Sequence, residues 1–188
     1  MNRKSTAITA AIAAVVLAGC TQAVRMQSAT DSVVDTGIRS NFAYAAGIGE
    51  MNTVIIGNPF DLPAAQVQQT VLGAMQGNHF GPRTRFTTEP SERARSDYRI
   101  VVVFDFPIGV PQHRVCGPTE DMPQAAGGSR LGMTTVFCWR DQVISWVNAD
   151  TARPASPDDR AFRTLVANSM WNLLPTQDHM SSRDDTWM

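Results

Sequence analysis

The sequence predicts an α+β fold, with a mainly antiparallel sheet of about five or six strands and two or three helices packed on it. Residues 98–106 form the clearest strand, because both faces are largely apolar in the middle, which places it centrally. Residues 131–139 and 142–148 alternate like two strands of a hairpin. Apolar residues recur at helical spacing in residues 61–77 and 156–173.

The first half of the chain predicts two helices around a buried strand. An amphipathic helix is expected from Asp31, with its apolar stripe at Val34, Ile38, Phe42 and Ala45. Residues 51–57 are short, apolar and β-branched, which favours a buried strand. Asp61 suits the N-cap of the next helix and Gly77 its C-terminal cap. Its stripe is Val67, Val71 and Met75.

The second half predicts more strands, one loop and a last helix. Short strands are expected at residues 83–88 and 113–116, with a mobile surface loop at 117–130 between the latter and the hairpin. Ser156, Pro157 and two acids are typical of a helix start. The buried stripe of that helix is predicted at Phe162, Leu165, Val166, Ser169, Met170 and Leu173. Pro175 ends the helix.

Strict alternation divides the predicted hairpin, which turns at Arg140-Asp141, into two faces. One face carries Phe137, Trp139, Ile144 and Trp146, and the other carries Val136, Cys138, Val143 and Val147. If the helices cover one of these faces, the other is an apolar binding surface or a dimer contact. The alternative, that the N-terminal segment or loop 117–130 folds over this face, stays open.

The N-terminus is an expected export signal. A basic start at Arg3 and Lys4 is followed by the uncharged run 7–18, which is shorter than the roughly 20 residues needed to span a membrane. Leu17-Ala18-Gly19-Cys20 closely resembles the lipobox of bacterial lipoproteins. That resemblance implies cleavage between Gly19 and Cys20, and covalent diacylglycerol and an N-acyl chain on Cys20. No other cofactor is expected.

The resemblance also sets the expected organisation. Residues 1–19 are the signal peptide, 20–30 the lipidated N-terminus and flexible tether, 31–175 a single α+β domain, and 176–188 a disordered tail. Thr21 stands where an inner-membrane retention signal would have Asp, which implies the outer membrane. The domain would then face the periplasm, close to the membrane that anchors it.

Two cysteines remain, Cys116 and Cys138, and an oxidising compartment favours a disulfide between them. Alternatively, these cysteines with His113 and His79 offer ligands for zinc or copper. The disulfide is the simpler use of the same sulfurs, so no metal is expected.

Arginine supplies all positive charge after the signal, with 14 arginines against 17 acids. This acidic balance gives no general attraction to nucleic acid. In the densest basic cluster, Arg83, Arg85 and Arg99 are candidates for contact with an anion or partner. The alternative is a solvated edge balanced by nearby acids.

Catalytic motifs are missing, since the chain has neither GxSxG nor HExxH. His79 with Asp97 or Asp105 is a conceivable pair, but any chain of this length offers such pairs. The sequence therefore predicts a non-enzymatic lipoprotein that binds an envelope protein or component, as an assembly or maintenance accessory. The alternative is an envelope enzyme acting on peptidoglycan or lipid.

Overall fold

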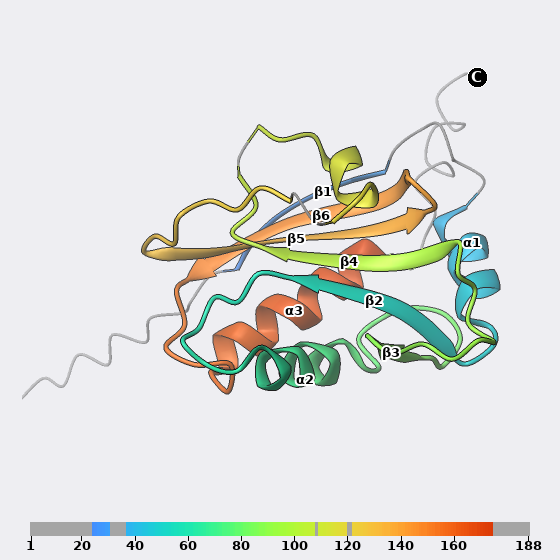
Figure 1. The fold of residues 1–188 in the computed structure, drawn as a ribbon, viewed down its shortest axis with the longest axis horizontal. Helices are drawn as coiled ribbons and strands as arrows, with labels where there is room; N and C mark the ends of the chain where they lie inside the picture. The colour runs from blue at the N-terminus through green and yellow to red at the C-terminus, as the bar shows by residue number, and fades with distance from the viewer. Residues whose placement is uncertain (1–23, 31–36, 108, 120–121, 175–188) are drawn as a thin grey trace, which may run out of the picture.

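The computed structural model describes residues 24–30, 37–107, 109–119 and 122–174, with one six-stranded sheet and three α-helices (Figure 1). The α+β prediction is thereby confirmed. The elements, in chain order, are β1 (Arg25–Thr30), α1 (Ile38–Ala46), β2 (Glu50–Ile56), α2 (Ala64–Met75), β3 (Arg85–Thr87), β4 (Tyr98–Phe104), the 3-10 helix η2 (Gln112–Cys116), β5 (Arg130–Trp139), β6 (Gln142–Ala152) and α3 (Arg160–Leu173).

The sheet is mixed rather than mainly antiparallel, with strand order β1-β6-β5-β4-β2-β3. The four strands β1, β6, β5 and β4 pair antiparallel, whereas β2 runs parallel to both β4 and β3. Helix α2 is the crossover between β2 and β3, which parallel strands require. The sequence pattern located β2 to β6 but not β1, and it did not show which neighbours the strands pair with.

Helices α2 and α3 cover one face of the sheet, and α1 lies at one end of it (Figure 1). The predicted stripes of both covering helices are buried against this face, and so are Tyr98, Ile100, Val102 and Phe104 of β4. We call this cluster the helix-side core. Asp159 caps α3 with its carboxylate, which accepts a hydrogen bond from the N–H of Ala161 at 2.9 Å.

A smaller apolar cluster fills the other face, under η2 and the loops beside it. Val101, Val136 and Val143 of the sheet pack there against Val115 and Cys116. Met122 and Phe106 add partly buried side chains. The segment between β4 and β5 therefore covers part of this face. This agrees with the alternative that loop 117–130 folds over the face that the helices leave open.

Three local predictions are corrected. Residues 25–30, expected in a flexible tether, form β1, whose backbone pairs with β6 from Arg25 opposite Asp150 to Thr30 opposite Ser145. Residues 113–116, expected as a strand, belong to η2, which packs Val115 and Cys116 onto the sheet face opposite α2 and α3. Helix α1 begins at Ile38, not Asp31.

Residues 1–23, 31–36 and 175–188 lie outside the described residues, and with them the predicted signal, Pro175 and the predicted tail.

The predicted division of the hairpin into two faces is also wrong. In β6, Ile144 and Ser145 stand opposite Phe137 alone, which is a β-bulge. The extra residue shifts the alternation by one position, so Trp146 joins Val136 and Cys138 while Val147 joins the helix-side core. The predicted apolar binding face therefore does not exist as one surface. Phe137 and Ile144 are fully buried under the helices, Trp139 is half-buried beside them, and Trp146 lies on the opposite face.

Among the described residues, no helix has both the length and the apolar composition that crossing a membrane would need.

Candidate binding groove

We call the sheet face opposite α2 and α3 the helix-free face, because no α-helix of the described residues covers it. A groove of about 560 Å³ lies on this face, where β1, β6 and β5 meet the segment that follows β4. Its size is within the range of small-ligand and peptide-side-chain sites. Trp146 lies in the groove, and Phe106, Pro107, Gly109, Val110 and Gln112 line it from the loop. The strands contribute Arg25, Met26, Gly132, Met133, Thr134, Asn148, Ala149 and Asp150.

Gly132 is responsible for an open part of the groove floor. Neighbouring positions of β5 place Leu131 and Met133 in the helix-side core, so position 132 points to the helix-free face. A Cβ atom built on Gly132 would have no heavy atom within 4 Å. The backbone φ of Gly132 is outside the left-handed region, so a larger residue fits the strand there. The missing side chain therefore leaves space rather than serving a turn.

The polar side of the groove is oriented by hydrogen bonds. The Thr134 hydroxyl donates to Asn148 Oδ1 at 2.8 Å, which directs the amide nitrogen of Asn148 away from Thr134. Arg130 pairs with Asp150 and also donates to its backbone carbonyl at 3.2 Å. Arg25 stands opposite Asp150 in the register of β1 and β6, and its side chain is exposed. The groove thus combines apolar surface with hydrogen-bond donors.

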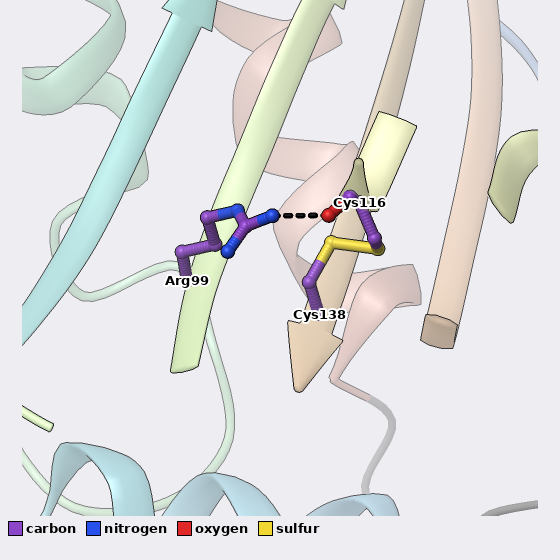
Figure 2. Close-up of a disulfide and its surroundings, with 3 residues drawn as sticks. All are labelled: Arg99, Cys116 and Cys138. Atoms are coloured by element: carbon purple, nitrogen blue, oxygen red, sulfur yellow. Dashed lines mark hydrogen bonds between the residues drawn. A yellow bond between two sulfur atoms is a disulfide. The ribbon is translucent and has the colours of Figure 1, made fainter. Parts of the chain in front are cut away.

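A disulfide holds the C-terminal end of the loop wall. Cys116 and Cys138 are bonded, with their Cα atoms 5.6 Å apart, which confirms the predicted pair. Both cysteines are fully buried, and Arg99 of β4 donates to the carbonyl oxygen of Cys116 beside the bond (Figure 2). Covalent bond and guanidinium therefore attach η2 to two neighbouring strands.

An ion pair holds the other end of the wall. The guanidinium of Arg153 donates to both carboxylate oxygens of Asp105, at 3.0 and 2.8 Å. Asp105 has a φ of 50°, a left-handed conformation that aspartate tolerates better than most residues. The same carboxylate accepts from the N–H of Gly132 at 3.3 Å, and Arg153 also donates to the carbonyl of Gly128 at 2.6 Å. The pair therefore joins the loops after β4, before β5 and after β6.

The predicted arginine cluster does not converge on one site. Arg85 pairs with Glu50, whose carboxylate also accepts from the N–H of Ser91. The hydrogen bond from Arg85, and then that from Ser91, lowers the pKa of Glu50 to about 2. Arg99 is held on the helix-free face by Cys116, whereas Arg83 is exposed before β3. Two of the three arginines thus have internal partners.

The residues of the alternative metal site and catalytic pair also do not come together. The two sulfurs are bonded to each other, and His113 is exposed on η2. Within the part of the chain that the structure describes, there is no cluster of three or more His, Cys, Asp or Glu that could hold a metal. His79 packs edge-on against Phe42 and Phe86, at centroid distances of 5.2 and 5.1 Å.

Burial lowers the pKa of His79, since a charged imidazole is poorly solvated between these rings. Its proposed partners are engaged elsewhere. Asp97 pairs with Arg140 at 3.4 Å, and Asp105 pairs with Arg153. Neither carboxylate therefore forms the conceived catalytic pair.

Sequence reasoning missed the groove. Asn148 and Asp150 follow Trp146 at intervals of two, which is a signal for a partly polar strand face. The bulge at Ile144 concealed which face this is. The pairing of Asp105 with Arg153 has no local signal, because the two residues are 48 positions apart and meet only in the folded sheet.

No protein-family model matches the sequence, and no curated protein matches it significantly. Two solved structures of the PelC dodecamer from Paraburkholderia phytofirmans, in different crystal forms, are similar in fold. Each is 11% identical, covers 82% of this chain and 100% of its own, and has a TM-score of 0.42. A similarity of this size gives no argument about function.

Proposed function

We propose that this protein is a lipoprotein of the bacterial outer membrane, anchored through Cys20, whose periplasmic domain binds an envelope protein or component without catalysing a reaction. The observation that carries the binding role is the groove of about 560 Å³ over Gly132. Its walls are held by a disulfide at one end and by the Asp105–Arg153 pair at the other. Such pre-organised walls reduce the entropy lost when a partner binds.

The lining indicates what the partner presents to the groove. Phe106, Val110 and Trp146 offer contact to an apolar group. The guanidinium of Arg25 and the oriented amide of Asn148 offer hydrogen-bond donors to carbonyl or carboxylate oxygens. An extended peptide segment with one large apolar side chain matches both requirements. This supports an envelope protein as the partner.

The alternative of an envelope enzyme has no comparable support. It would need a nucleophile or base beside an orienting group. His79 lies among aromatic rings, and no hydrogen bond or ion pair joins the exposed His113 on η2 to a carboxylate within the described residues. We therefore do not propose it.

The anchor is tested by labelling cells with radioactive palmitate. The wild-type protein is expected to incorporate label and to sediment with outer membranes. Cys20→Ser is expected to lose the label, because the thiol that carries diacylglycerol is absent. Equal labelling of the two proteins would rule out the anchor.

The groove is tested by Gly132→Leu, which fills its floor. A photoreactive residue at Val110 should capture a partner in cells, and Gly132→Leu should reduce capture at least about tenfold, equivalent to about 1.4 kcal/mol of lost binding. Gly73→Leu is the matched control, since a Cβ there also meets nothing within 4 Å and Gly73, on α2, does not line the groove. Undiminished capture in folded Gly132→Leu protein would contradict the proposal.

A further inference from the structure

The start of β1 and three loops lie together at one end of the sheet. Strand β1 begins at Arg25 and β5 at Arg130, where β2, β4 and β6 end, at the left in Figure 1. Contacts join the loops there. Residues 57–59, 124, 125 and 127 line one small cavity with Asp105 and Arg153, and Arg153 also donates to the carbonyl of Gly128. We call residues 57–63, 124–129 and 154–157 the anchor-side end.

The connection from Cys20 to this end is short. Because β1 extends back to Arg25, only residues 21–24 separate it from Cys20, and Val24 already packs against the helix-side core. Five residue steps span at most about 18 Å when fully extended. An acyl anchor on Cys20 therefore keeps the anchor-side end at the membrane surface.

Charge is distributed unequally between the two ends of the sheet. The anchor-side end contains one ionisable side chain, Asp61, among its three loops. Beside these loops, Arg130 and Arg153 are neutralised in pairs with Asp150 and Asp105, whereas Arg25 at the start of β1 is exposed. The loops at the opposite end, residues 88–97 and 140–141, carry Glu89, Glu92, Arg93, Arg95, Asp97, Arg140 and Asp141.

Exposure agrees with the charge distribution. Leu62 in the 57–63 loop is 36% exposed, and residues 124–129, which are uncharged, are all exposed. Removing charges from water is costly, whereas neutral and apolar groups enter the lipid interface readily. With one ionisable side chain in its loops against seven at the opposite end, the anchor-side end comes nearer to this requirement.

We propose that the anchor-side end docks on the lipid bilayer surface, with Leu62 and residues 124–129 in contact with lipid. The proposal rests on the proposed lipid anchor at Cys20. The strands then point away from the membrane, and the Arg140 turn stands about 33 Å further out, the length of the ten residues of β5. The groove, which includes Arg25, opens close to the membrane surface.

The test uses full-length lipidated protein with an environment-sensitive fluorophore on one introduced cysteine. Leu62→Cys and Ala126→Cys report on the anchor-side end, and Asp141→Cys is the matched control at the opposite end. Each protein is reconstituted in vesicles of phosphatidylethanolamine and phosphatidylglycerol that contain a spin-labelled lipid quencher. Loss of most emission at positions 62 and 126, with none at 141, is the expected result.

Flotation of the same vesicles separates the two hypotheses. If the protein floats with vesicles but all three positions are quenched equally, the docking orientation is wrong and the anchor stands. If wild-type protein floats no better than Cys20→Ser, the anchor itself is wrong and the docking proposal fails with it. Circular dichroism of each variant verifies that the fold is retained.

Discussion

Replacing both Cys116 and Cys138 with alanine is expected to lower the free energy of unfolding by about 3 kcal/mol. The bond closes a loop of sequence separation 22, and its loss restores conformational entropy to the unfolded chain. The native state also loses the attachment of η2 to β5, which holds the wall of the groove. Replacing both residues avoids a lone reactive thiol.

Urea denaturation under oxidising conditions measures the difference, and hydrogen exchange of residues 109–117 measures the loosening of the wall. The control is reductant, which should destabilise the wild-type protein and leave the double variant unchanged. An unchanged denaturation midpoint in the double variant would show that the disulfide contributes nothing to stability.

Phe162→Ala is expected to lower the free energy of unfolding by about 4 kcal/mol, the usual cost of removing a buried aromatic ring. Phe162 is fully buried in the first turns of α3. Its ring stacks on Phe104 at 5.6 Å and meets Phe60 edge-on at 5.0 Å. The substitution therefore leaves a cavity where α3, β4 and the loop after β2 come together.

Phe80→Ala is the matched control, because Phe80 is 37% exposed and lies under Arg39 at 4.0 Å. Its loss is expected to cost about 1 kcal/mol or less. Chemical denaturation of both variants provides the comparison. Equal effects of the two substitutions would mean that burial of Phe162 is not what stabilises α3 on the sheet.

Local patterns predicted the elements whose signal is confined to neighbouring residues. The stripe of α2 at Val67, Val71 and Met75 is buried as expected, and so is that of α3. Strand β4 alternates between the two clusters as its sequence indicates. These predictions succeed because helical and strand periodicities follow from backbone geometry alone.

The candidate site depended on long-range pairing, and its prediction failed where one residue broke a local rule. The bulge at Ile144 sends Trp146 to the helix-free face, so four predicted face residues are divided between the two sides of the sheet. Residues 25–30 are polar enough to suggest a tether, yet β6 supplies backbone partners for them. Backbone hydrogen bonds of this kind are largely independent of side-chain type.

Composition and periodicity were enough to predict the α+β class, the two covering helices, the central strand and the cysteine pair, because they specify burial within each segment. The strand order, the partners of Arg85, Arg99 and Arg153, and the groove over Gly132 could be seen only in the folded protein. The physical reason is that these features join residues far apart in the chain. Their relative positions exist only after the sheet has assembled.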